Sequence, residues 1–350
     1  MSKDLLSIQY LRAIAALMVV LVHMEGHLTR LGYRGGWPSV LNGGVDIFFV
    51  ISGFIMWVTT ANRTVTPWQF LYHRLLRIAP LYWILTTLTI ALMVAAPSLY
   101  QGGQNGAGHI FASYLFIPAE HPLLHTMVPV LLPGWTLNYE MMFYLLLAVC
   151  LPLRPALRMT AMITILGLLA LSHPLWPDDK SIPAYYTQSV ILEFAFGMAL
   201  GAFFISGRTI PSRAAVALVV IGALAMIGLS VLDLPRVIGA GIPAAMIVAG
   251  EVYFERACGL NRLPVLSLLG DASYSLYLTH GLVLSIVRQI WLRAGLSALP
   301  YNLPLFVVFA VSASCITAFL SYRYVEQPIL AIGRSQRWLA PAPIRGPSNL

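Results

Sequence analysis

The chain has 350 residues, of which 59% are apolar or aromatic and only 10% are charged. Its mean hydropathy is +0.79, whereas a soluble domain carries roughly a quarter charged residues. This composition excludes a cytosolic enzyme, a disordered chain and a small disulfide-rich secreted protein, so it predicts a protein embedded in lipid. The net charge of +8 comes without any run of consecutive basic residues. We therefore expect no nucleic-acid partner.

The three cysteines show no pattern of a metal site or a disulfide framework. Cys150, Cys258 and Cys315 are far apart, lack CxxC spacing and lie in or beside apolar stretches. Metal and disulfide motifs need more closely defined spacings. We expect these residues to pack as small apolar side chains and the protein to hold no metal.

Apolar stretches predict an all-α, polytopic integral membrane protein with about ten transmembrane helices. A spanning helix needs about 20 mostly apolar residues. With the N-terminus in the cytoplasm, the inner loops collect 14 basic residues and the outer loops 5. The positive-inside rule then predicts that both termini are cytoplasmic. The predicted spans are approximately 8–25, 45–62, 79–96, 135–152, 159–174, 185–205, 214–232, 237–254, 264–290 and 304–325.

Ionisable residues inside the spans are candidates for function, because each costs roughly 2.5–3.5 kcal/mol at mid-membrane even on a lenient scale. Arg12 and His23 of the first span are eleven positions apart. At about 100° per residue they share one helix face, with a rise of about 16 Å between them. His27 continues this stripe one turn further. The stripe predicts a cavity or a helix interface along the first span.

Asp46 opens the second span, at the depth expected for His23. A carboxylate at that depth would fix the tautomer of a histidine general base and raise its basicity. The alternative is that Asp46 caps the start of its own helix with its side-chain oxygens. The sequence leaves both interpretations open.

Arg74 and Arg77 are three residues apart in the segment before the third span, so they share a helical face at the cytoplasmic surface. One interpretation is a topology signal with contact to anionic lipid. The other is a phosphate clamp, because the planar guanidinium fork matches phosphate oxygens.

Two further spans carry polar side chains at helical spacing. Glu140 and Tyr144 are one turn apart on the fourth span, with Glu140 roughly 9 Å from its start. Ser273, Tyr277 and His280 recur on one face of the ninth span. Packing between helices accounts for the hydroxyl groups, but it explains His280 less well.

The sequence predicts no role in the site for the end of the chain. Glu326 closes the tenth span, where a solvated helix end is the simple explanation. The segment 333–350 is rich in Pro, Arg and Ala, and it predicts a disordered cytoplasmic tail.

Taken in order, these segments resemble the membrane-bound acyltransferase family 3. The resemblance rests on Arg12 with ten residues before His23, followed by GGVDIFFVISGF, FLYHRLLRIAPLYW, WTLNYEMMFY, GDASYSLYLTH and YVEQP. It covers about residues 5–328, which we interpret as one acyltransferase domain. Within the family, the chain looks most like the exopolysaccharide-production O-acetyltransferases, because its single-module length leaves no room for a fused SGNH hydrolase-like domain.

The resemblance implies transfer of an acyl group, most commonly acetyl from cytoplasmic acetyl-CoA, to a hydroxyl of a cell-surface or exopolysaccharide sugar or its lipid-linked precursor. It implies a place in the bacterial inner membrane. The expected partners are a saccharide or lipid-linked saccharide acceptor, membrane lipid and the polysaccharide assembly machinery. The motif residues of the family fall on Arg12, His23, Arg74, Arg77 and Glu140.

These residues predict a mechanism in which the arginines bind the phosphates of the donor and the thioester reaches His23 through a buried channel. His23 would act as general base, oriented by Asp46 or Glu140, while Tyr277 or His280 would stabilise the oxyanion. An acetyl-histidine intermediate remains an open alternative. Further residues expected on the substrate side are His27, Tyr144 and Ser273.

Other functions remain possible for the same pattern. A transporter or flippase of lipid-linked saccharide also carries polar stripes in its spans, and histidines can report pH in a sensor. Within the enzyme class, the acceptor could instead be O-antigen, a glucan or a small lipophilic product. The ordered set of motifs favours the enzyme.

Overall fold

The computed structural model describes residues 5–95 and 106–335, and over these ranges the chain is helical, which confirms the predicted all-α fold. No strand forms within the described residues, where Glu120 and Met127 make an isolated bridge. The helices are α1 (Leu6–Arg30), α2 (Gly43–Thr60), α3 (Pro67–Ala95), α4 (Ala107–Tyr114), α5 (Trp135–Cys150), α6 (Pro155–Leu171), α7 (Ile182–Tyr186), α8 (Leu192–Ile205), α9 (Ser212–Leu229), α10 (Ile242–Cys258), α11 (Pro264–Asp271), α12 (Ser273–Arg293), α13 (Asn302–Ser321) and α14 (Gln327–Ser335).

The predicted membrane spans are supported in part. Seven helical segments of the described chain are long and apolar enough to cross a bilayer, and they include α1, α2, α3, α8, α9, α10 and α13. The remaining predicted spans fall on α5 and α6, with 16 and 17 residues, and on α11 and α12, which are separated at Ala272. The structure therefore supports a polytopic membrane protein without confirming a count of ten.

The outward faces of the helices carry large apolar side chains. Val149, Leu171 and Val231 are each 77–78% exposed, and many others are similar. A monomeric soluble protein rarely exposes apolar patches of this extent. Such a surface fits contact with lipid tails.

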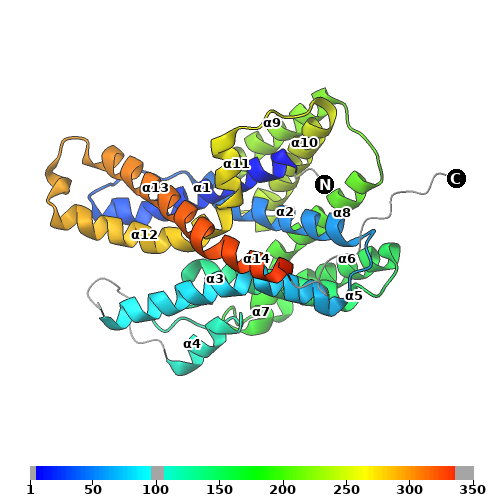
Figure 1. The fold of residues 1–350 in the computed structure, drawn as a ribbon, viewed down its shortest axis with the longest axis horizontal. Coiled ribbons are helices and arrows are strands. Elements are labelled where there is room, and N and C mark those ends of the chain that lie inside the picture. Colours follow the sequence, from blue (N-terminus) through cyan, green and yellow to red (C-terminus); the bar gives the residue numbers. More distant parts are fainter. Residues whose placement is uncertain (1–4, 96–105, 336–350) are drawn as a thin grey trace.

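α1 and α2 lie at the centre of the bundle (Figure 1). α9 and α10 lie on one side of them and α3 and α4 on the other, while α12 and α13 pack beside α1. The buried apolar residues form three clusters, and Phe48 of α2 packs against all three. Phe48 therefore contacts all three apolar clusters of the helix bundle.

Two glycines allow α2 and α8 to approach closely. A Cβ at Gly53 would lie 2.1 Å from the carbonyl oxygen of Phe194, and a Cβ at Gly197 would lie 2.0 Å from that of Val50. Helices in lipid associate through van der Waals packing, which small residues strengthen by letting the backbones meet. This contact fixes the position of α2 and of the polar side chains it carries.

The start of α1 is held by Glu255 of α10. The two Glu255 carboxylate oxygens accept hydrogen bonds from the backbone N–H groups of Leu6 and Ser7 at 2.9 and 2.8 Å, and Ser7 Oγ adds a third at 2.6 Å. The first N–H groups of a helix have no partner within the helix, and the partial positive charge there favours an acid. This cap fixes the entry of the helix that carries Arg12.

The structure differs from the predicted segments at two places. α3 begins at Pro67 and runs for 29 residues through Pro80, so Arg74 and Arg77 lie inside a continuous helix rather than in a separate interfacial segment. The ninth span is interrupted at Ala272, where α11 turns away from α12 (Figure 1). The predicted tail 333–350 starts within α14, and residues 336–350 lie outside the described part of the chain.

Candidate active site

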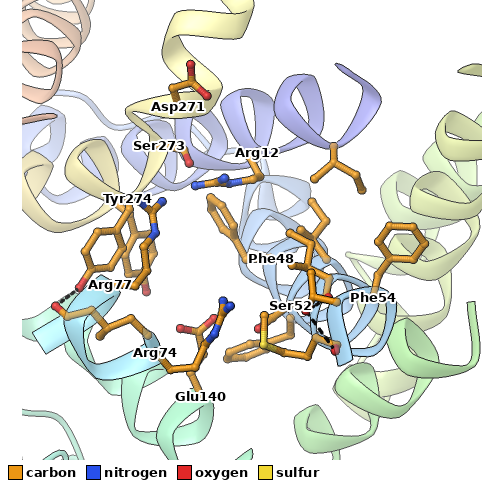
Figure 2. Close-up of a pocket in the computed structure, with 18 of the residues that line it drawn as sticks. Arg12, Phe48, Ser52, Phe54, Arg74, Arg77, Glu140, Asp271, Ser273 and Tyr274 are labelled. Carbon is orange, nitrogen blue, oxygen red and sulfur yellow. Dashed lines mark hydrogen bonds between the residues drawn. The ribbon is translucent and has the colours of Figure 1, made fainter. Parts of the chain in front are cut away.

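A cavity of about 900 Å³ lies between α1, α2, α3, α5 and α12, and it is called the arginine cavity below. Figure 2 shows Arg12 of α1 and Arg74 and Arg77 of α3 pointing into it. Pockets for cofactors and small molecules are typically about 300–1,000 Å³ in volume. Seven residues predicted from the sequence line this cavity, namely Arg12, Arg74, Arg77, Glu140, Tyr144, Ser273 and Tyr277.

Two of the three arginines have no acceptor of their own. Within residues 5–95 and 106–335, neither Arg12 nor Arg74 forms a hydrogen bond or an ion pair, and the buried Nε of Arg74 has no partner. The guanidinium of Arg74 lies 5.7 Å from the ring centre of Phe70. A guanidinium carries five N–H donors that suit phosphate oxygens. Both side chains can therefore bind an anionic ligand in the cavity.

Arg77 is already paired, and its partner corrects a sequence-based interpretation. Arg77 Nη1 donates to Glu326 Oε1, and Ser275 Oγ donates to Glu326 Oε2 at 2.8 Å. Glu326 is 2% exposed, so the interpretation of a solvated helix end is wrong. Tyr274 lies beside the pair, with its ring centre 5.7 Å from the Arg77 guanidinium.

Glu140 and Tyr144 belong to the arginine cavity and not to the surroundings of His23. The Glu140 carboxylate interacts electrostatically with Arg74, Arg12 and Arg77, and Figure 2 shows it on the cavity wall near Arg74. One turn along α5, the Tyr144 hydroxyl lies 3.4 Å from Ser52 Oγ. Glu140 therefore lies among the three arginines of the cavity, away from His23.

His23 and His280 form a second polar group, called the histidine pair below. Their ring centres are 4.9 Å apart with an interplanar angle of 62°. His23 is exposed, whereas His280 is fully buried. The first span and the ninth predicted span are thus brought together at the residues that the sequence singled out.

Backbone carbonyl groups fix the tautomers of both imidazoles. His23 Nδ1 lies 2.8 Å from the carbonyl oxygen of Val19, and His280 Nδ1 lies 3.3 Å from that of Leu276. A carbonyl oxygen can only accept, so each Nδ1 carries the hydrogen, and in the neutral form of each ring Nε2 then has the lone pair. His280 Nε2 is buried and has no partner within the described residues. In this tautomer His23 can act as a base at Nε2, but His280 cannot donate a hydrogen bond from Nε2 to an oxyanion.

The prediction that Asp46 orients His23 is wrong in this structure. The two oxygens of Asp46, which is fully buried, accept from Nε and Nη2 of Arg236, each at 2.8 Å. Arg236 also lies 5.7 Å from the ring centre of Trp135. Helix capping is not the explanation either, because this bidentate pair joins α2 to the segment before α10. The carbonyl of Val19 takes the role that was expected of a carboxylate.

The arginine cavity does not extend to the histidine pair. Neither His23 nor His280 lines it, whereas Phe48 and Tyr277 do, with ring centres 5.9 Å apart. The Tyr277 ring centre lies 6.2 Å from that of His280. The expected open channel is therefore closed by side chains, and Tyr277 stands between the cavity and the histidines.

Tyr277 is held in this position by two hydrogen bonds. Its hydroxyl lies 2.8 Å from Thr136 Oγ1 and donates to the carbonyl oxygen of Pro133 at 2.9 Å. The single hydroxyl hydrogen is thus occupied, so Tyr277 has none to offer an oxyanion in this arrangement.

His27 is separate from both groups. It is half-buried one turn beyond His23, its Nδ1 has no partner within the described residues, and it does not line the arginine cavity. The structure gives no contact that joins it to a substrate-binding surface.

Several residues of the site were missed by the sequence analysis. Ser52, Thr136 and Tyr274 line the cavity, and Arg236 holds Asp46. Hydroxyl groups and single arginines of this kind are common in helices and at helix ends, so they give no signal on their own. The signal that could have found the three cavity residues is the set of family motifs, because Ser52 lies in GGVDIFFVISGF, Thr136 in WTLNYEMMFY and Tyr274 in GDASYSLYLTH.

The chain is similar to known acyltransferases. A family model described as an acyltransferase domain matches residues 5–323. The exopolysaccharide production protein ExoZ of Rhizobium meliloti is 37% identical over 297 residues, which cover 84% of this chain and 91% of ExoZ. No solved structure matches the chain significantly.

Two further relatives are more distant. The putative membrane-bound transacylase BcsY of Komagataeibacter xylinus is 29% identical over 77% of this chain and 70% of BcsY. The O-acetyltransferase OatA of Staphylococcus aureus is 24% identical over 91% of this chain but only 56% of OatA. The family model covers nearly the whole chain, and with these relatives it shows that the protein is an enzyme. The chain belongs to the membrane-bound acyltransferase family 3.

Proposed function

We propose that this enzyme transfers an acetyl group from acetyl-CoA to a hydroxyl of an exopolysaccharide sugar or of its lipid-linked precursor. The observation that carries the proposal is the combination of two features. Arg12 and Arg74, which line the cavity, have no acceptor within the described residues, and the Nδ1 atom of His23 on the same helix as Arg12 is bound to a carbonyl, which leaves Nε2 for chemistry. The first suits a polyphosphorylated donor, and the second suits removal of a proton from a hydroxyl.

The donor would bind with its phosphates in the arginine cavity. Arg12 and Arg74 offer N–H groups without an acceptor of their own, and Arg77 lines the same space. The rise of about 16 Å along α1 from Arg12 to His23 is comparable to the reach of an extended phosphopantetheine arm. The thioester would therefore approach the histidine pair from the Tyr277 side of the cavity.

A movement of Tyr277 would complete this approach. When its hydroxyl leaves Pro133 and Thr136, the side chain no longer closes the cavity, and its hydrogen becomes free to donate. The same movement would open the route to His23 and supply the oxyanion donor that His280 does not provide in its present tautomer.

The reaction then balances with residues of this chain. His23 Nε2 takes the proton of the acceptor hydroxyl, whose oxygen attacks the thioester carbonyl carbon. The carbon–sulfur bond breaks, and the proton passes from His23 to the departing thiolate. The products are an O-acetyl ester and free coenzyme A. Since no group other than His23 is needed as base, direct transfer is the simpler route.

The class of acceptor is proposed from the similarity to ExoZ, which is a protein of exopolysaccharide production. We further propose that the arginine cavity faces the cytoplasm and that the enzyme lies in the inner membrane of a bacterium. The excess of basic residues in the loops on that side supports this orientation.

Mass spectrometry of surface polysaccharide tests the proposal. Polysaccharide from cells that contain the protein should be heavier, by one acetyl group per modified sugar, than that from cells that lack it. The deletion strain complemented with the His23→Ala variant should match the deletion strain. An unchanged exopolysaccharide together with acetate lost from lipopolysaccharide or a glucan would overturn the proposed acceptor, and no change in any acyl group would overturn the reaction.

A further inference from the structure

Glu326 is a buried acid that pairs with Arg77, one of the residues lining the arginine cavity. Its two oxygens accept from Arg77 Nη1 and from Ser275 Oγ, and its side chain is 2% exposed. The three residues come from α3, from α12 and from the segment that joins α13 to α14. Glu326 is thus a link between three parts of the chain that meet at the cavity.

The backbone around Glu326 is unusual. Residues Tyr322–Glu326 form a π-helical turn between α13 and α14. Such a turn inserts one extra residue, so it redirects the side chains that follow, and π-turns are frequent at functional sites. In this turn Tyr322 lines the cavity and Glu326 is buried beside Arg77, whereas Tyr324 is 72% exposed. The turn therefore aims Glu326 at Arg77.

The pairing distinguishes Arg77 from Arg12 and Arg74. Arg77 is held on one side by Glu326 and lies beside the Tyr274 ring, yet it lines the cavity and its side chain remains 27% exposed. A long flexible side chain loses rotamer freedom when it binds a ligand. A guanidinium that is already fixed loses less, so it binds more tightly for the same contacts.

We propose that Glu326 is a positioning residue for donor binding, which fixes Arg77 so that its remaining N–H groups contact a phosphate of the acyl-CoA donor. Ser275 has a smaller share in this role, because it donates one hydrogen bond to the same carboxylate. The inference rests on the proposed function. The negative charge of Glu326 by itself would repel an anionic donor, so the direction of the effect separates positioning from simple charge.

The test is the dissociation constant of coenzyme A for the full-length protein purified in lipid nanodiscs. Glu326→Gln should raise the constant about 10-fold and Ser275→Ala about 3-fold, because Arg77 loses its charged partner or part of its support. Glu251→Gln is the matched control, because Glu251 lies on α10 and does not line the cavity. It should leave the constant unchanged.

A double-mutant cycle shows whether Glu326 acts through Arg77. In an Arg77→Ala background, Glu326→Gln should have no further effect on the binding of coenzyme A. Thermal midpoints without ligand are measured in parallel, since a merely structural role would lower the midpoint and leave the affinity of the folded protein unchanged. Tighter binding by Glu326→Gln, an unchanged constant, or additive effects of the two substitutions would each overturn the inference.

The same experiment distinguishes failure of the proposed function. If the wild-type protein does not bind coenzyme A, the proposed donor is wrong, and the inference about Glu326 falls with it. If the wild-type protein binds coenzyme A and the Glu326→Gln variant binds it equally well, only the inference about Glu326 is wrong.

Discussion

The arginine cavity and the histidine pair differ in how their polar groups are satisfied. In the cavity, Arg12 and Arg74 have no acceptor within the described residues, so donor groups are left for a ligand. At the histidine pair, each Nδ1 is hydrogen-bonded to a backbone carbonyl oxygen of its own helix. Only the Nε2 atoms remain to contact a substrate. The first region therefore leaves N–H groups that suit an anion, and the second leaves one nitrogen of each imidazole without a carbonyl partner.

Two ion pairs that each contain a buried acid, Arg77–Glu326 and Arg236–Asp46, also differ in whether they face the cavity. Arg77 is exposed to the cavity beside Glu326, whereas Asp46 uses both oxygens on Arg236. In this bidentate pair each oxygen of the buried acid accepts from the guanidinium, so Asp46 is committed to Arg236. The comparison suggests that the cavity governs donor affinity, His23 governs the chemical step and the Asp46–Arg236 pair governs stability.

The largest expected effect is on the chemical step. His23→Ala should lower acetyl transfer by about 10²–10⁴-fold, which is the usual contribution of a general base. The dissociation constant of coenzyme A should stay the same, because His23 does not line the arginine cavity. Transfer and binding are measured on the same purified protein, with the exposed loop residue His125→Ala as control. Near-normal transfer by the His23 variant would remove the distinction between the two regions.

The next effect is on stability. Asp46→Asn should destabilise the protein by about 1.5–3 kcal/mol, because the two hydrogen bonds from Arg236, whose side chain is 37% exposed, then no longer go to a charged group. A thermal or denaturant unfolding curve in detergent measures the loss. The pH dependence of the remaining activity should be that of the wild type, since Asp46 does not contact His23 in this structure.

A displaced pH profile in the Asp46→Asn variant, without a loss of stability, would instead favour the earlier interpretation of Asp46 as the partner of His23. Replacing both residues, as in Asp46→Asn with Arg236→Gln, should cost less than the sum of the single changes, because the two side chains interact directly.

A smaller effect is expected on donor binding. Arg74→Ala should raise the dissociation constant of coenzyme A by about 10- to 100-fold, since a hydrogen bond to a charged group contributes roughly 1.5–3 kcal/mol. Turnover at saturating donor should change little. Arg213→Ala, at an exposed position on α9, is the matched control. A drop in turnover with an unchanged dissociation constant would contradict the assignment of Arg74 to the donor.

The smallest expected effect is on turnover, and it comes from the position of Tyr277 between the arginine cavity and the histidine pair. Thr136→Val removes a hydroxyl that lies 2.8 Å from the Tyr277 hydroxyl and keeps the side-chain shape. The loss of about 1 kcal/mol from the closed position should raise turnover by at most about fivefold. Steady-state kinetics measures this. A fall in turnover would show that Tyr277 must stay where it is during the reaction.

Much of this organisation could be predicted from the sequence, because it depends on local patterns. The predicted donor-binding arginines, Arg12, Arg74 and Arg77, do line one cavity, whereas Glu140, which was expected to orient His23, lines that cavity as well. The spacing of Arg12 and His23 on α1 was also informative, since it placed the arginine cavity and the histidine pair at two levels of a single helix.

The partners of these residues could not be predicted, because they depend on how distant helices pack. Asp46 pairs with a residue 190 positions away, and Arg77 with one 249 positions away. The π-turn that aims Glu326 inward and the break at Ala272 have no clear mark in the composition of their segments. Every helix has backbone carbonyl groups such as that of Val19, so the sequence could not predict that this one is the partner of His23.

One measurement tests directly whether a donor held in the arginine cavity presents its acyl group to His23. Bromoacetyl-CoA places an electrophilic carbon where the acetyl group would be, and the site of alkylation can be mapped by mass spectrometry. The exposed Cys258 and the partly buried Cys315 are first replaced by Ser to remove competing thiols. We expect alkylation of the imidazole of His23, blocked by excess coenzyme A and strongly reduced in Arg74→Ala. Inactivation that coenzyme A prevents, with the label on another residue and none on His23, would contradict the account.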